Sequence, residues 1–234
     1  MIDISTLGAT LLDRTITNNE IVTVNDWLDG ATHPTFVRQQ DKFKTIELIL
    51  IIAAGSEEDN MQSCSTLLDY FKGENELSFE DIPSYTFDVV LTAHKVERLK
   101  PAVWKLTLTF QSGYTKGQVV TLPWDSMATN LTFDNNGNAP SAFILTLVVN
   151  NVADIVEEII TVNGEEMPFR NLEAGHTYVF DRGKGTFYDE TENKSVINLY
   201  EGYVLPKLKN GTNIFTASWE IGISASVEYY PQYI

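Results

Sequence analysis

The sequence predicts a mainly β protein of two domains with a single helix. Three observations carry this prediction. The chain has 234 residues with 43% hydrophobic content, enough for one large or two small cores. Its 12 Phe, 10 Tyr and 4 Trp are spread over the whole length among many Thr and Val, the residue types that favour strands. Beyond Pro140, turn-forming residues recur every eight to twelve positions, a spacing typical of short strands.

The first half begins with a strand and a helix. Apolar residues alternate at the start of Thr45–Ile52 and end as a continuous β-branched run, which predicts a strand buried on both faces at one end. Ser56 then precedes three acids. Its hydroxyl can cap a helix N-terminus, and the acids favour the positive end of the helix dipole. The helix extends toward Gly73 along one apolar stripe: Met61, Cys64, Leu67, Leu68 and Phe71.

A long β-hairpin is predicted next. Tyr85–Arg98 and Val103–Ser112 are rich in Val, Thr, Leu and aromatic residues and flank the dipeptide Lys100-Pro101. In the second segment, apolar residues alternate with Lys and Thr, which is the period of a strand with one buried face. A short strand, Tyr114–Leu122, is expected to follow.

A polar stretch from Asp125 to Pro140, with several adjacent turn formers, predicts the domain boundary. The expected domains are residues 1–125 and 140–234, with 126–139 as a linker. About eight strands after Pro140 suit a β-sandwich of two packed sheets. The first two, Ala142–Asn150 and Ile155–Val162, are expected to pair with each other, and Asn163-Gly164 forms a tight turn after the second. Five further strands are expected after this turn: His176–Asp181, Thr186–Tyr188, Val196–Leu199, Ile214–Trp219 and Ile221–Tyr230.

Charge and cysteine content limit the function classes. The chain carries 16 basic and 32 acidic residues, a net charge of −16, and an acidic surface repels the phosphate backbone. We therefore expect no tight nucleic-acid binding. One cysteine permits no intrachain disulfide, which fits a reducing compartment. The longest apolar run, Phe43–Ala54, is interrupted by Lys44 and Glu47 and is too short for a membrane span. Met1–Asp13 carries acids and no basic region before a long apolar stretch, so we expect that it is not a secretory signal.

No group of residues in the sequence indicates catalysis. His33, His94 and His176 are far apart and, with one cysteine, give no zinc spacing. The acid pairs Glu157-Glu158 and Glu165-Glu166 point to opposite faces of a strand and cannot act on one bond. The sequence predicts no catalytic residue, no metal, no cofactor and no enzymatic activity.

Six segments of the second half follow one another in a characteristic order, ending in a Pro-x-Leu turn, a Gly-x-Asn turn and a last strand with tyrosines: Ile159–Gly164, Leu172–Gly175, Tyr178–Asp181, Leu205–Leu208, Gly211–Asn213 and Val227–Pro231. In this order the region resembles the distal tail proteins of long-tailed, siphovirus-type bacteriophages and prophages. The first half resembles the ring-forming domain of that family in the order of its elements. It departs from the family at Trp27–Pro34, where a glycine-rich segment is expected.

The resemblance implies a specific architecture and role. The N-terminal domain would be β-barrel-like and ring-forming, and the C-terminal domain a galectin-like β-sandwich. Six copies would form a hub ring in the tail tip, between the tail tube and the host-adsorption apparatus, and let DNA pass. The implied partners are the tail tube protein and tail-associated or receptor-binding proteins. The protein would be made in the host cytoplasm and located in the virion tail.

A ring subunit needs exposed edges or hairpins that pair with neighbours. One face of the first hairpin strand fits either the intramolecular core or such an interface: Tyr85, Phe87, Val89 and Leu91. Four acids in the loop before the hairpin either face an acidic channel or belong to a solvated turn: Glu74, Glu76, Glu80 and Asp81.

The alternative function is a carbohydrate-binding module that contacts host surface glycans. Such a module needs an aromatic platform, and Trp219 is the candidate in the second domain, with Trp124 at its border. A structural tryptophan of the sandwich is the competing interpretation of Trp219, because it lies among alternating apolar residues.

Overall fold

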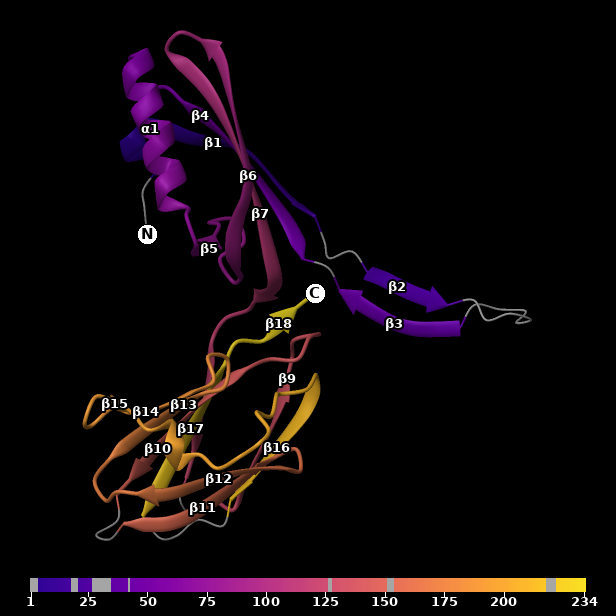
Figure 1. Cartoon of the computed structure of the whole chain (residues 1–234), viewed down its shortest axis with the longest axis vertical. Coiled ribbons are helices and arrows are strands. Elements are labelled where there is room, and N and C mark those ends of the chain that lie inside the picture. The colour runs from indigo at the N-terminus through magenta and orange to yellow at the C-terminus, as the bar shows by residue number, and fades with distance from the viewer. Residues whose placement is uncertain are drawn as a thin grey trace. The chain divides into compact units, whose positions relative to one another are not determined.

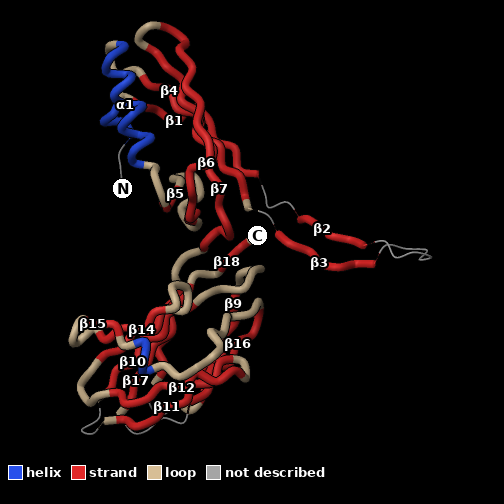
Figure 2. The backbone as a smooth tube through the Cα atoms, in the orientation of Figure 1, coloured by secondary structure: helices blue, strands red, loops and turns tan. Residues whose placement is uncertain are grey.

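The computed structural model of the chain describes residues 4–17, 21–26, 35–41, 43–125, 128–150, 154–217 and 222–234, with the backbone alone for 21–26 and 35–41. Its contacts divide the chain into two compact units, Met1–Thr115 with Ile234 and Lys116–Tyr233. Strands dominate both units (Figures 1 and 2). The predicted mainly β fold with one α-helix is confirmed for the described residues.

The first unit is built on a twisted antiparallel sheet with strand order β1-β4-β7-β6-β5. Two further strands, β2 and β3, pair only with each other among the described residues. The elements are η1 (Ile4–Leu7), β1 (Ala9–Thr17), β2 (Ile21–Asp26), β3 (Thr35–Asp41), β4 (Lys44–Ile52), α1 (Glu57–Tyr70), β5 (Glu74–Ser78), β6 (Thr86–Lys100) and β7 (Val103–Lys116).

Helix α1 covers one face of this sheet (Figure 1). The predicted cap is present: the Ser56 hydroxyl accepts a hydrogen bond from the Asp59 backbone N–H at 3.1 Å. Four residues of the predicted apolar stripe pack in the core beneath the helix, Cys64, Leu67, Leu68 and Phe71, and the ring of Phe71 meets that of Phe110 edge to face at 5.2 Å. Met61 was expected in the same stripe, but it is 59% exposed. None of the helices in the described residues is long and apolar enough to cross a lipid bilayer.

The core of the first unit lies between α1 and the sheet. In β4, Ile46, Leu50 and Ile52 are almost fully buried on the helix side, and Ile49 and Ile51 are half-buried on the other side. The strand therefore alternates over its whole length, whereas its sequence predicted burial on both faces at one end. The second face of the sheet is less covered than the first.

The second unit is a β-sandwich. One sheet has the order β15-β14-β13-β10-β17-β8 and the other β12-β11-β16-β9. The elements are β8 (Val120–Trp124), β9 (Asn130–Asn135), β10 (Phe143–Val149), β11 (Ile155–Val162), β12 (Glu165–Leu172), β13 (Thr177–Asp181), β14 (Thr186–Asp189), β15 (Lys194–Ser195), η2 (Ile197–Leu199), β16 (Gly211–Ala217), β17 (Ile223–Tyr229) and β18 (Gln232–Tyr233).

Hydrogen bonds between two asparagine side chains and the backbone connect two turns of the sandwich. Asn213 is fully buried, and its side chain donates to the carbonyl of Lys209 at 3.0 Å and accepts the Lys209 N–H at 2.9 Å. The same oxygen accepts a bond from Asn163 at 2.9 Å. Asn163 and Gly164 both have positive φ, as the predicted tight turn requires, and this turn joins β11 to β12. These bonds satisfy polar groups that burial would otherwise leave unpaired.

The predicted linker at 126–139 is wrong. Within it, β9 pairs with β16 from Asn130 to Asn135, and β8 just before it pairs with β17. Both strands belong to the second unit, which begins at Lys116. Leu131 and Phe133 of β9 pack against the core of the sandwich, so this polar stretch is an edge strand.

The expected pairing of the first two sandwich strands is also wrong. They correspond to β10 and β11, which lie in different sheets: β10 pairs with β13 and β17, and β11 pairs with β12 and β16. The turn at Asn163-Gly164 sends the chain straight back as β12, which takes one side of β11.

Two other strand predictions need correction. The expected strand Val196–Leu199 is largely the 3-10 helix η2, since the Leu199 N–H bonds to the Val196 carbonyl at 2.8 Å. The expected strand Tyr114–Leu122 is divided between the end of β7 and the start of β8.

Replacing Gly137 with alanine is expected to destabilise the protein strongly. A Cβ at this position would lie 2.4 Å from the backbone oxygen and 2.6 Å from the backbone nitrogen of Gln232. Backbone atoms cannot swing aside, so we expect a loss near the upper end of the roughly 1–3 kcal/mol typical of overpacking. Gly113→Ala is the control, because a Cβ there meets nothing within 4 Å, and its effect should stay within about 1 kcal/mol. Urea unfolding of both variants measures the difference, and equal midpoints would contradict the prediction.

Candidate functional site

The face of the first sheet opposite α1 has a distinct composition. Register places one set of side chains on this face, which we call the open face: Thr10, Asp13, Thr15, Thr17, Thr45, Glu47, Ile49, Ile51, Glu74, Glu76, Thr86, Asp88, Val90, Lys105, Thr107, Thr109 and Gln111. In β6, these residues alternate with Phe87 and Val89, which are buried on the helix side. Threonine and acid dominate, because β-branched polar side chains suit a strand surface that meets solvent.

The open face is electrostatically negative. It carries five carboxylates, those of Asp13, Glu47, Glu74, Glu76 and Asp88, from four different strands. Among the residues that the register places on this face, one is basic: Lys105, which lies 3.7 Å from the carboxylate of Glu97. A polyanion near this surface would be repelled over about a Debye length.

The sheet has two edges at which another chain could pair. β1 is a terminal strand, and a β-bulge between Leu11 and Asp13 leaves Leu12 out of register with β4. On the other side, β5 pairs with β6 only up to Val90, and no described strand continues along that side of β6 toward Lys100. Unpaired backbone groups along a strand are a template for pairing with another chain.

Exposed apolar side chains accompany both edges. On β1, Leu11 is 40% and Leu12 is 64% exposed, and on the outer part of β6, Val96 is 41% and Leu99 is 54% exposed. Charged side chains usually protect open edges. Apolar residues at both ends of one sheet are therefore typical of a surface that another chain covers.

The structure divides the residues predicted for the oligomer interface. Phe87 and Val89 are 3% and 2% exposed and belong to the core under α1, so the intramolecular alternative holds for them. Tyr85 is exposed and Leu91 is half-buried. The correction follows from strand period: this face of β6 is the face that the helix covers, and the exposed edge residues lie further along the strand.

The four predicted channel acids are not brought together. Glu74 and Glu76 lie on the open face, and Glu80 is exposed in the turn after β5. Asp81 accepts two hydrogen bonds from the Arg14 guanidinium, at 2.8 and 2.7 Å, and this contact lowers the pKa of the carboxyl. Arg14 also lies over the ring of Phe79, 4.1 Å from its centre. In the β1 register, Arg14 is on the helix side, so Asp81 does not share the face of Glu74 and Glu76.

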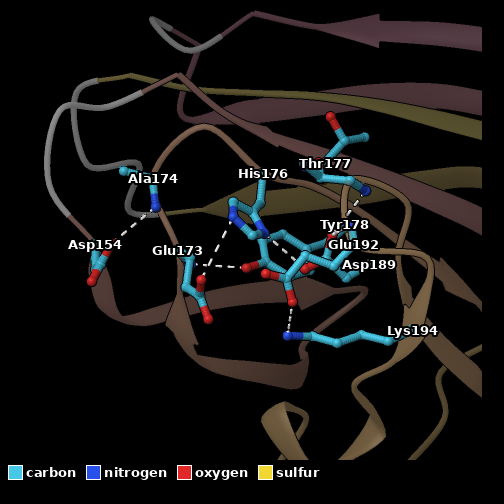
Figure 3. Close-up of polar contacts among 10 residues, drawn as sticks. Asp154, Glu173, Ala174, His176, Thr177, Tyr178, Asp189, Glu192 and Lys194 are labelled. Carbon is cyan, nitrogen blue, oxygen red and sulfur yellow. Dashed lines mark hydrogen bonds and ion pairs between the residues drawn. The ribbon is translucent and has the colours of Figure 1, made fainter.

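A second polar cluster lies at one end of the sandwich (Figure 3). His176 is placed between two carboxylates, with Nδ1 2.8 Å from Asp189 Oδ2 and Nε2 3.6 Å from Glu173 Oε2. Its ring stacks on Tyr178 with 6.0 Å between centres. Glu192, which pairs with Lys194, completes the cluster.

The buried carboxylate of Asp189 organises this cluster. Burial opposes its ionisation, but the hydrogen bonds from His176 and from the backbone N–H groups of Glu192 and Thr191 outweigh that effect and lower its pKa. The hydrogen bond to Asp189 in turn raises the pKa of His176, with the charges of Asp189, Glu173 and Glu192 adding to it.

The structure does not test Trp219 as the aromatic platform of a glycan-binding site. Trp219 lies outside the described residues. Trp124 is 2% exposed, packs edge to face on Phe215 and donates its indole N–H to the Ala128 carbonyl at 2.9 Å, so it is a core residue and presents no platform.

Sequence reasoning missed the exposed edges and the histidine cluster. Leu11 and Leu12 break the period-two pattern of their strand, which was an available signal. Glu173 and His176 are three residues apart, but Glu192 comes close only because Tyr178 of β13 pairs with Asp189 of β14. That pairing leaves no local signature.

Comparisons of sequence alone found no relative. No protein-family model matches the chain, and no curated protein matches it significantly.

Comparison of folds gives clear matches. The Dit protein of phage SPP1, described as a paradigm of the hub adsorption apparatus in phages that infect Gram-positive bacteria, matches with a TM-score of 0.79 and 12% identity, over 100% of this chain and 96% of Dit. A chain of the phage P2 baseplate in its activated conformation with calcium matches with a TM-score of 0.59 and 9% identity, over 97% of this chain and 92% of that chain. The corresponding structure with strontium matches with a TM-score of 0.58 and 11% identity, over the same shares. The predicted resemblance to distal tail proteins is thus confirmed at the level of the fold, and this chain has the fold of the phage hub protein Dit.

Proposed function

We propose that this chain is the structural subunit of a hub ring in a phage tail tip. Six copies form the ring between the tail tube and the host-adsorption apparatus, and DNA passes through its centre. The observation that carries the proposal is the fold match to SPP1 Dit, which extends over both units of the chain with a TM-score of 0.79. The match supports the proposal because both units of the chain take part in it.

The two edges of the first sheet support ring closure. In a head-to-tail contact, one surface of a subunit meets a different surface of the next, and a ring closes when the rotation divides the circle. The β1 edge with Leu11 and Leu12 and the β6 edge with Val96 and Leu99 are two such different surfaces on one sheet. Pairing them would satisfy both sets of unpaired backbone groups and bury the exposed apolar side chains.

The open face supports the passage of DNA. A channel that lets DNA pass must not hold it, and five carboxylates with one lysine form a wall that repels phosphate. Six chains at −16 each give a ring of −96, so the field of the whole assembly has the same sign. We assign the open face to the channel wall, with Glu74 and Glu76 on it.

We assign the second unit to contacts with tail-associated or receptor-binding proteins. The ring itself contacts the tail tube protein. This assignment places the chain in the virion tail after synthesis in the host cytoplasm. A non-enzymatic role remains a prediction, supported by matches to hub and baseplate structures. The described residues provide no feature that favours the glycan-binding alternative.

Electron microscopy of the purified full chain tests the proposed function. We expect class averages with six-fold symmetry and a stain-filled centre. Rings with another symmetry would contradict the hexamer. Compact particles without a central channel would contradict the passage of DNA.

A further inference from the structure

The histidine cluster of the second unit contains three groups that can bind a metal ion. Glu173 lies in the turn between β12 and β13, His176 directly precedes β13, and Glu192 lies in the turn between β14 and β15. One ligand atom from each residue lies within 4.8 Å of the others. Figure 3 shows the imidazole of His176 beside the carboxylate of Glu173, with Glu192 close to Asp189.

Asp189 holds the imidazole in the orientation that a metal ligand needs. Its carboxylate is 1% exposed and lies 2.8 Å from Nδ1 of His176, so it accepts the Nδ1 proton and leaves the lone pair on Nε2. Metal-binding histidines usually have such a carboxylate at the second ring nitrogen, where it fixes the tautomer and raises ligand basicity. Backbone N–H groups of Thr191 and Glu192 fix Asp189 in turn, at 2.9 and 3.2 Å.

The surroundings of Nε2 favour a bound cation. Nε2 of His176 lies 3.6 Å from a carboxylate oxygen of Glu173, so a positive charge between these two atoms, either a proton on Nε2 or a metal ion in its place, is stabilised by the carboxylate. Glu192 adds a third negative group, and the cation near it in the described residues is Lys194. Lys194 is 47% exposed, and its flexible stem can leave Glu192 for solvent.

The ligand types select the metal. One imidazole nitrogen and two carboxylate oxygens suit zinc, which takes nitrogen and oxygen ligands in a tetrahedral site, whereas calcium takes oxygen ligands alone. We propose that Glu173, His176 and Glu192 bind one zinc ion, with the fourth position open to water. The ion would join the β12–β13 turn to the β14–β15 turn at the end of the sandwich. This inference does not depend on the proposed function.

Calorimetric titration of the metal-free full chain with zinc chloride tests the site. We expect one ion per chain. Asp189→Asn should weaken binding about 10–100-fold, because the imidazole loses its orienting carboxylate. Glu192→Gln removes one ligand from an exposed turn, so it should weaken binding at least tenfold without unfolding the chain. Lys194→Met should tighten binding, since it removes the competing cation.

Nitrogen NMR of the imidazoles separates this site from general binding to an acidic surface. The chain has three histidines, and zinc should shift Nε2 of His176 alone. His94→Ala is the control, because His94 is exposed on β6 in the first unit, and it should leave the affinity unchanged. Absence of stoichiometric binding would overturn the proposal. So would unchanged affinity in Glu192→Gln, or zinc binding that shifts no nitrogen of His176.

Discussion

Replacing Val96 and Leu99 together with lysine is expected to break the ring into single chains while each chain stays folded. Both side chains are about half exposed beside the unpaired part of β6, so solvent can accept the new ammonium groups in the free chain. In the ring, the same positions would be covered by the β1 edge of the next subunit. Full burial of such a side chain contributes roughly 1.5–3 kcal/mol, so covering the exposed half of each contributes about half of that, and burying the new charges costs more. Light scattering coupled to gel filtration should show the mass fall to 26.3 kDa.

Met61→Lys is the matched control for this experiment. Met61 is 59% exposed on α1 and belongs to neither edge strand, so the same type of substitution there should leave the mass unchanged. Circular dichroism establishes that every variant keeps its fold. A ring that survives Val96→Lys with Leu99→Lys, or one that dissociates equally in Met61→Lys, would show that the β6 edge is not the contact.

Reversing the charge of Glu76 and Asp88 is expected to make the ring retain DNA. These residues face each other in the β5–β6 register on the open face. Two replacements by lysine change the charge of each chain from −16 to −12 and place twelve lysines on the proposed channel wall of six copies. A protein that contacts about 6–10 phosphates loses about 10³–10⁵ in affinity between roughly 50 and 200 mM salt. Gel shifts should therefore show retention at low salt that disappears as salt is added.

The control variant carries the same charge change elsewhere. Glu58 is exposed on α1 and Glu190 follows β14 in the second unit, and lysine at both positions gives the same net charge. Retention by this control would mean that net charge, and not the open face, decides binding. Retention of DNA by the original protein, weakened steeply by salt, would contradict an acidic channel.

Local signals in the sequence predicted individual elements well. The Ser56 cap and the following acids determine where α1 begins, because all the interacting groups lie within one turn. The positive φ values that Asn163 and Gly164 adopt explain why that dipeptide predicted a turn. The strand from Ile155 to Val162 was predicted with its observed ends, since alternation and turn residues define both.

Long-range strand pairing could not be predicted in the same way. Asn130–Asn135 is polar enough to be taken for a linker, and its role as an edge strand depends on β16, about eighty residues later. This pairing places the ring of Phe133 in the core, with its centre 5.8 Å from that of Phe215 and 5.3 Å from that of Tyr229. The sequence therefore predicted most strands of the sandwich at the right residues, but it paired some of them with the wrong neighbouring strand.

The candidate site shows the same limit. The acids of the open face come from β1, β4, β5 and β6, so only the sheet register assembles them. Sequence reasoning selected acids from a single loop, and the structure separates Asp81 from Glu74 and Glu76 by its contact with Arg14. For Phe87 and Val89 the sequence left the intramolecular core and an interface both open, because strand period cannot tell whether the same chain or another one covers a face.

The mass of the full chain in solution tests the hub-ring proposal most directly. Native mass spectrometry at micromolar concentration should give six times 26.3 kDa, about 158 kDa, as the dominant species. The Val96→Lys and Leu99→Lys variant, measured alongside, should give 26.3 kDa. A dominant mass of 26.3 kDa for the unmodified chain over the whole concentration range would contradict the ring.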